Sequence, residues 1–98
     1  MATTNEYKDY ILEILDGIGE IKCRKMMGEY LLYNNGTLFG GIYDNRFLVK
    51  KTENTAKYNM EEQLPYDGAK MMYMPSDLDN KALIEEIVLT ACEDLRKK

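Results

Sequence analysis

The stretch from Ile21 to Lys51 constrains the fold most, because apolar and polar residues alternate along it and turn residues recur at hairpin spacing. Asn34-Asn35-Gly36 is the strongest turn, since Asn and Gly tolerate positive φ. The predicted strands run from Ile21 to before Gly28, from Tyr30 to Tyr33, from Leu38 to Tyr43 and from Phe47 to Lys51. Gly40-Gly41 predicts a bulge or a close backbone approach. The result is a four-stranded antiparallel meander, with one face on helices and the other open to solvent or a partner.

Helical periodicity brackets this region at both ends of the chain. The apolar face of the first helix consists of Tyr7, Tyr10, Ile11, Ile14, Leu15 and Ile18. Thr3 and Glu6 have the spacing of a capping box, and Gly17 or Gly19 is expected to end this helix. The apolar face of the last helix consists of Leu83, Ile84, Ile87, Val88, Ala91 and Leu95. Ser76 or Asp79 is its expected N-terminal cap.

The segment between the meander and the last helix predicts one more helix and one more strand. Thr52 is expected to cap a short helix from Glu53 to Gln63, although its apolar stripe is weak. Residues 64–68 are expected to end this helix. Lys70 to Met74 then predicts a fifth strand that stops at Pro75. The order α-β4-α-β-α predicts an α+β fold, in which N- and C-terminal helices pack an antiparallel sheet of four to five strands.

Composition narrows the chemistry that the chain can perform. Its 98 residues predict one domain over residues 1–98, and they include no histidine, the commonest general acid or base and a frequent metal ligand. The carboxylates of Glu61-Glu62 and of Glu85-Glu86 are neighbours in sequence, so on a helix the members of each pair would point ~100° apart. We therefore expect no enzyme, no cofactor and no metal site.

The two cysteines, Cys23 and Cys92, predict reduced thiols in a cytoplasmic protein, since they form neither a CxxC pair nor a disulfide framework. The alternation of side chains along the first predicted strand places Cys23 on the same face as Ile21, which favours burial of the Cys23 thiol. Its basic neighbours would instead lower the pKa of an exposed thiol, which keeps a redox-sensing role open. No apolar run is long enough for a signal peptide or a membrane span. The net charge of −4 predicts weak direct nucleic-acid binding at most.

Several short motifs occur in an order that resembles a known family. They are Gly19-Glu20-Ile21, Arg24 through Tyr30, Asn35-Gly36, Leu38 through Ile42, Arg46 through Lys50, Leu64-Pro65-Tyr66 and Met72 through Pro75. Together they resemble the TfoX N-terminal domain, the front half of the TfoX/Sxy competence regulators, over roughly Tyr7 to Leu95. The sequence departs from the family pattern at Met27, usually Phe, and at Glu29, usually Gly. The competence regulators also continue into a helical C-terminal domain, whereas this sequence ends at Lys98.

The resemblance implies a fold of the secretion-chaperone-like type and a non-enzymatic role as a bacterial, cytoplasmic protein-binding domain. In the family that role is transcriptional coactivation. Within this interpretation the expected partner-binding surface consists of Arg24, Lys25, Gly28, Tyr30 and Lys50. Two alternatives stay open: a homodimeric structural or chaperone-like module whose apolar sheet face binds a peptide or a second copy, and a thiol sensor at Cys23.

Overall fold

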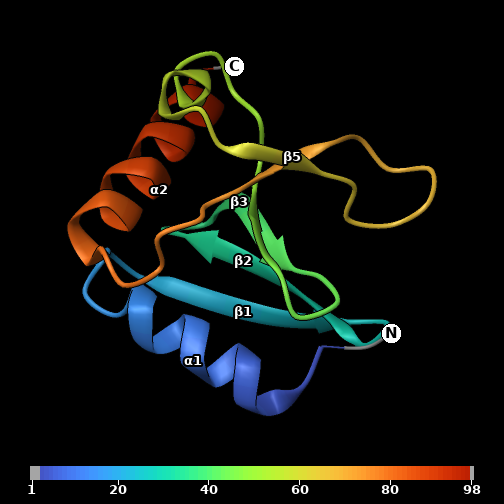
Figure 1. The fold of residues 1–98 in the computed structure, drawn as a ribbon. Helices are drawn as coiled ribbons and strands as arrows, with labels where there is room; N and C mark the ends of the chain where they lie inside the picture. The colour runs from blue at the N-terminus through green and yellow to red at the C-terminus, as the bar shows by residue number, and fades with distance from the viewer. Residues whose placement is uncertain (1–2, 98) are drawn as a thin grey trace.

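The computed structural model describes residues 3–97, which begin with the expected amphipathic helix (Figure 1). Helix α1 spans Asn5–Leu15, and the hydroxyl of Thr4 accepts a hydrogen bond from the backbone N–H of Tyr7 at 3.1 Å. The cap is therefore Thr4, and the expected capping box at Thr3 and Glu6 is wrong by one residue. Thr3 instead lies buried and donates its hydroxyl hydrogen to a Glu29 carboxylate oxygen at 2.7 Å. The chain leaves the helix through Gly17, at φ 90°, as predicted.

The predicted meander is confirmed. Its strands are β1 (Ile21–Met26), β2 (Glu29–Asn34), β3 (Thr37–Ile42) and β4 (Phe47–Val49). They pair antiparallel in sequence order. The β2–β3 turn at Asn35-Gly36 has φ values of 48° and 85°, the geometry that Asn-Gly favours. The β1–β2 turn has the same geometry with Met27 and Gly28, at φ 53° and 84°. Alternation therefore determines the strands, and the glycine-containing pairs Met27-Gly28 and Asn35-Gly36 determine the turns between them.

The predicted irregularity in the third strand is also present. Leu32 pairs with Gly40 and Tyr33 with Leu38, so Phe39 is an extra residue on β3. Next to this bulge the backbones approach closely, because a Cβ on Gly40 would collide with the carbonyl oxygen of Leu48 on β4. Glycine at position 40 therefore lets β3 and β4 pair at this point.

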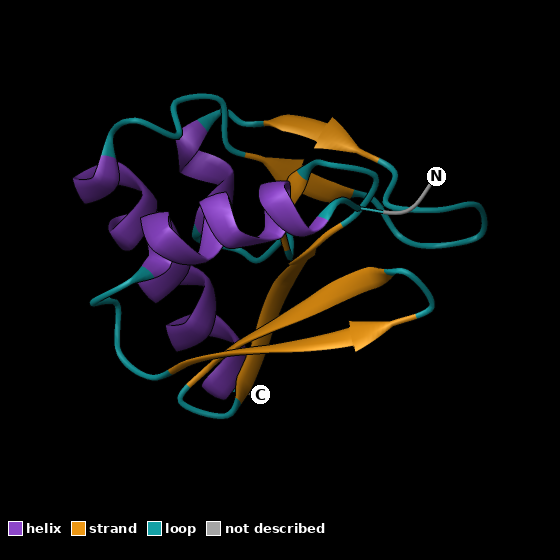
Figure 2. Cartoon of the chain, turned by 90° about the horizontal axis from the view of Figure 1, so that it is seen from below, coloured by secondary structure: helices purple, strands orange, loops and turns teal. Residues whose placement is uncertain are grey.

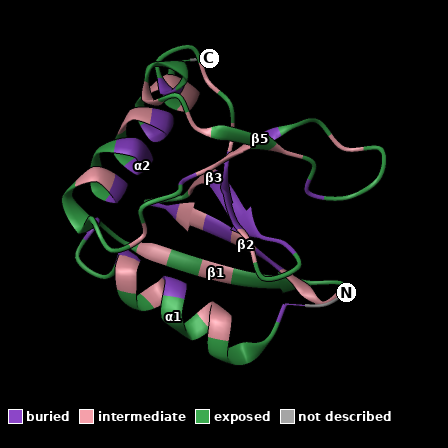
Figure 3. Ribbon diagram, in the orientation of Figure 1, coloured by how far each residue is buried: buried purple, intermediate pink, exposed green. Residues whose placement is uncertain are grey.

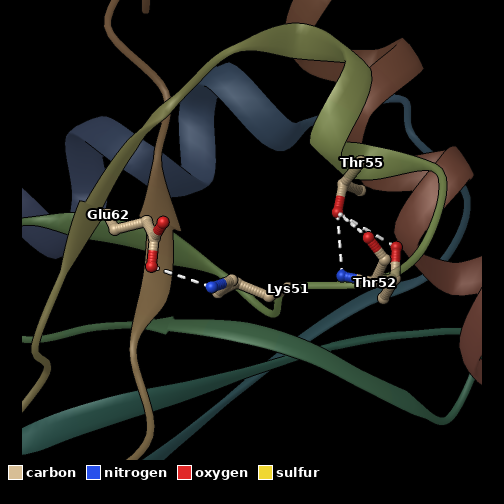
Figure 4. A network of polar contacts seen from close by, with 4 residues as sticks. All are labelled: Lys51, Thr52, Thr55 and Glu62. Atoms are coloured by element: carbon tan, nitrogen blue, oxygen red, sulfur yellow. Dashed lines mark hydrogen bonds and ion pairs between the residues drawn. The ribbon is translucent and has the colours of Figure 1, made fainter.

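The segment from residue 53 to residue 63 differs from its prediction. It forms one turn of 3-10 helix, η1 (Thr55–Tyr58), and then the strand β5 (Glu61–Gln63). The turn begins where Thr55 accepts the backbone N–H of Thr52 at 2.9 Å (Figure 4). It ends at Asn59, which adopts a left-handed conformation with φ 53°. The expected helix over this segment is therefore wrong, because local threonine and asparagine turns outweigh its weak apolar stripe.

The predicted strand of residues 70–74 is confirmed in a shorter form, β6 (Met72–Met74), which completes a six-stranded sheet. The strand order is β1-β2-β3-β4-β6-β5, so β6 inserts between β4 and β5. Helix α2 (Lys81–Arg96) follows and is capped by Asn80, which accepts the backbone N–H of Leu83 at 3.1 Å. Neither Ser76 nor Asp79 is its cap. The α+β fold with terminal helices is confirmed, with six strands in place of four to five.

Both helices contribute to one large hydrophobic core against the sheet (Figure 2). Its fully buried members come from α1, α2 and strands β2 to β4, for example Ile11, Ile84, Leu32, Phe39 and Val49. Burial of such side chains is the main force that holds helices on the sheet. Within the described residues, no helix has the length and apolar character needed to cross a membrane.

Candidate protein-binding surface

The two faces of the sheet carry different clusters, because successive strand residues point to opposite sides. Tyr30 and Leu32 of β2 face the helices and belong to the large core. Leu31, between them, belongs to a second and smaller cluster with Tyr43, Leu48, Met72 and Met74. No described helix residue belongs to this second cluster. We call its side of the sheet the open face.

A groove of ≈ 1000 Å³ lies over the open face. Its lining on the sheet side includes Met26, Leu31, Leu38 and Tyr43. The opposite wall is the loop of residues 64–71 between β5 and β6, which projects beyond the sheet and is largely exposed (Figures 1 and 3). The groove is thus bounded by the sheet, by the 64–71 loop and by Leu95 near the end of α2, segments that are distant in sequence.

Exposed apolar side chains of the loop contribute to this groove. Tyr66 is 62% exposed and Met71 is 41% exposed, and both line the groove. The Tyr66 ring lies 6.0 Å from the Tyr43 ring, centroid to centroid, in a tilted arrangement. Clustered exposed apolar side chains are typical of interaction surfaces rather than of ordinary solvated surface.

Arg46 holds the loop in place. Its Nη1 donates to the Gln63 side-chain oxygen at 3.0 Å and to the Leu64 carbonyl at 3.1 Å. Its Nη2 donates to the Pro65 carbonyl at 3.3 Å, and its Nε donates to the Tyr43 carbonyl at 3.1 Å. The planar guanidinium therefore ties the β3–β4 turn to the groove wall. No local pattern in the sequence indicates this role, because Arg46 bonds to residues that lie 17 to 19 positions further along the chain.

The charged residues that line the groove are all cationic: Lys50, Lys51 and Lys70. The whole chain, in contrast, has 17 acidic and 13 basic residues. Lys51 is already paired, since its Nζ lies 2.8 Å from Glu62 and 5.4 Å from the centre of the Tyr73 ring (Figure 4 shows the ion pair). The hydrogen bond to Glu62 raises the pKa of Lys51. Lys50 and Lys70 form no ion pair within residues 3–97.

The structure separates the five expected contact residues. Arg24 lies opposite Leu31, on the open face, and Lys50 lines the groove. Lys25 lies opposite Tyr30 and so falls on the helix side of the sheet. Gly28 occupies the β1–β2 turn. The expected set therefore does not form one surface, and only Arg24 and Lys50 share the open face.

Tyr30 is not available for contact. It is only 6% exposed, and its hydroxyl donates to the Asn5 side-chain oxygen at 2.9 Å. The expectation that Tyr30 supplies an exposed aromatic contact is wrong, because it shares the parity of Leu32 on β2 and packs under the helices. Tyr66 is the exposed aromatic residue of the groove. The sequence pattern predicted only that the segment around Tyr66 ends a helix, and it did not indicate a binding site there.

Both cysteines lie in surroundings that disfavour the thiolate form. Cys23 is half-buried and packs against the large core. Burial raises the pKa of the Cys23 thiol more than the nearby Lys8 lowers it. Burial also raises the pKa of Cys92. Both thiols are thus held in the protonated, less reactive form. Among the described residues, no group of three or more His, Cys, Asp or Glu side chains is placed to hold a metal ion.

Comparison with known proteins identifies the family. The TfoX N-terminal domain model matches residues 13–94, which is most of the chain. The chain belongs to the TfoX N-terminal domain family. Among curated proteins, it is similar to an uncharacterized 12.7 kDa protein in the trpE 5′ region of Spirochaeta aurantia. The two are 31% identical over 84 residues, which cover 84% of this chain and 73% of the relative.

The family match includes the sheet and the whole 64–71 loop, and it begins within α1 and ends within α2. Every strand that contributes to the groove therefore belongs to the part of the chain that defines the TfoX N-terminal domain. Met27, where the family pattern usually has Phe, is 97% exposed at the β1–β2 turn. An apolar side chain at this position lies next to Met26, which lines the groove.

Proposed function

We propose that this TfoX N-terminal domain is a non-enzymatic, cytoplasmic protein-binding module that acts in transcriptional regulation. The groove on the open face would be its contact surface. The observation that carries the proposal is an apolar groove bounded by exposed Tyr66 and Met71, over the sheet face whose apolar cluster contains no described residue of α1 or α2. Family membership supports a regulatory role over a purely structural one.

The absence of catalysis is part of the same proposal. It is supported by a chain without histidine and by two thiols whose pKa values are raised by burial. Histidine is the commonest general acid or base, and a thiol acts as a nucleophile when its pKa is lowered. The groove walls, in contrast, supply apolar surface and lysine side chains, which are features of recognition.

The test is affinity capture with the full chain from a lysate of its source organism, followed by identification of the retained proteins. We expect a transcription factor or an RNA polymerase component to be retained by the unaltered chain and lost with Tyr66→Ala. Tyr10→Ala is the matched control, because Tyr10 is also exposed, at 43%, but lies on α1. Equal retention by both variants would remove the groove from the proposal. Retention of no transcription component would remove the regulatory role.

A homodimer is the second candidate, because exposed apolar surface such as Met26 and Tyr66 is also typical of subunit interfaces. A symmetric dimer through the groove would bring Lys50 and Lys70 of one copy toward the same residues of the other. Like charges brought together in this way disfavour association. Sedimentation equilibrium over a range of protein concentrations tests this candidate, and a monomer at every concentration would reject it.

A further inference from the structure

We infer that the groove binds a protein segment that combines apolar side chains with carboxylates, that is, an acidic and apolar peptide stretch of the partner. This inference rests on the proposed function and specifies the chemistry of its partner. The argument begins with the uneven distribution of charge. The chain carries a net charge of −4, yet its groove is lined by three lysines and by no Asp or Glu among the described residues.

The cations occupy different borders of the groove. Lys50 follows β4 and lies on the side of Leu48, on the open face. Lys70 belongs to the loop wall, and Arg24 lies on β1 opposite Leu31 of the groove floor. The apolar floor thus has basic groups beside it on both the sheet and the loop. A segment whose apolar side chains enter the groove would bring flanking side chains toward these cations.

Among residues 3–97, no carboxylate forms an ion pair with those cations. Glu62 pairs with Lys51, and Glu29 accepts hydrogen bonds from Thr3 and from the backbone N–H of Asp44. Lys50 and Lys70 have no ion pair within residues 3–97, so their charge is available to a ligand. Complementary charge increases both the rate and the selectivity of association.

A peptide fits this surface better than a nucleic acid does. The floor and loop wall present Leu31, Leu38, Met71 and Met72, which match apolar side chains and offer nothing to a phosphate backbone. Nucleic-acid binding proteins instead present a broad basic surface, whereas this chain has a pI near 4.8. A second copy is a less suitable occupant of the same groove, because the groove would meet its own lysines in a symmetric dimer.

The experiment selects peptides from a random display library on the folded full chain and measures their affinities. We expect the selected peptides to combine Asp or Glu with aliphatic or aromatic residues. Lys50→Glu with Lys70→Glu should weaken their binding by about tenfold or more. The matched control is Lys57→Glu with Lys81→Glu, which changes the net charge equally in η1 and α2, outside the groove, and should leave affinity unchanged. Added salt should weaken binding to the unaltered chain.

The folding of each variant is checked by circular dichroism, and Lys50→Gln with Lys70→Gln replaces the double reversal if the latter does not fold. Selection of neutral or basic peptides, or of none, would overturn the inference. Equal affinity for the groove variant and the control would also overturn it. Duplex DNA that binds more tightly than the peptides, and whose binding depends on Lys50 and Lys70, would overturn it as well. So would self-association of the chain that is abolished when Lys50 and Lys70 are substituted.

The outcome for the inference can be separated from the outcome for the proposed function. Neutral apolar peptides that lose affinity with Tyr66→Ala would overturn the role of charge and leave the groove as a protein-binding site. Peptides that are insensitive to Tyr66→Ala and to both lysine substitutions would contradict the groove itself.

Discussion

The two faces of the sheet differ in how completely their side chains are covered. On the helix side, Leu32, Phe39 and Val49 are fully buried beneath α1 and α2. On the open face the apolar cluster is small, and neighbouring Tyr66 and Met71 remain exposed at 62% and 41%. Because free energy from apolar burial scales with the area removed from water, the helix side supplies most of the stability. The proposed binding role of the open face can therefore be separated from stability by mutation.

The largest effect is expected from Phe39→Ala on the helix side. This substitution removes a fully buried ring at the β3 bulge and should lower the free energy of unfolding by about 3–5 kcal/mol. Met71→Ala, on the open face, should change it by about 0.5 kcal/mol or less. Urea denaturation followed by circular dichroism measures both. If Phe39→Ala does not fold, Ile84→Val provides a smaller deletion in the same core, with an expected loss of about 0.5–1.5 kcal/mol. Similar losses for both faces would contradict the comparison.

Gly40→Ala should have the next largest effect, because it strains the backbone pairing of β3 with β4, on which both faces of the sheet depend. The added Cβ would meet the carbonyl oxygen of Leu48, a backbone atom that can move only if β3 and β4 separate. We expect a loss of about 1–3 kcal/mol in the free energy of unfolding, measured by urea denaturation. Gly17→Ala is the control for the added methyl group, since no atom lies within 4 Å of its Cβ position. That control measures only the cost of its φ of 90°. A smaller loss at Gly40 than at Gly17 would show that the strands adjust without strain.

Arg46→Ala should act on the open face alone. Its guanidinium makes four hydrogen bonds that join Tyr43 to Gln63, Leu64 and Pro65, so its removal should release the loop wall of the groove. We expect a loss of about 1–2 kcal/mol in stability. Native-state hydrogen exchange should quicken in β5 and its loop, while β2 and β3 keep their protection. Arg46→Lys keeps the charge but not the planar set of donors, and should restore only part of the protection. Uniform loss of protection across the sheet would contradict a local role.

These expectations show which parts of the structure the sequence encodes locally. The meander follows from alternation and from turns such as Asn35-Gly36, both of which act within a few residues. The burial of Tyr30 was also encoded, because Tyr30 and Leu32 share one side of the same strand. Arg24 and Lys25 are adjacent, yet the same parity places them on opposite faces.

The groove could not be predicted in this way, since it depends on contacts between distant segments. The loop wall is placed by Arg46 and by the pairing of Val49 with Tyr73 between β4 and β6. Neither contact leaves a periodic pattern in the sequence. The short strand β5 was equally hidden, because Glu61 and Glu62 have low strand propensity and pair only through β6. Tertiary contacts therefore determine this part of the sheet and the candidate site with it.

The smallest expected effect concerns Met27 and has the opposite sign. This side chain is 97% exposed and sits at φ 53°, a conformation that asparagine adopts more readily than methionine. Met27→Asn should therefore raise the free energy of unfolding by about 0.5 kcal/mol, since no buried contact is lost. Thermal unfolding by differential scanning calorimetry measures the gain, and Met27→Ala separates the loss of the side chain from the relief of backbone strain.

The same substitution sharpens the comparison of the two faces when binding is measured beside stability. Met27 follows Met26, which lines the groove, so a partner that reaches this end of the groove would contact both. If Met27→Asn stabilises the fold but weakens partner capture, an apolar residue is kept at a strained and exposed position for recognition. If it stabilises the fold and leaves capture unchanged, the contact surface ends before the β1–β2 turn. Stability on the helix side and recognition on the open face would then be separated at Met26.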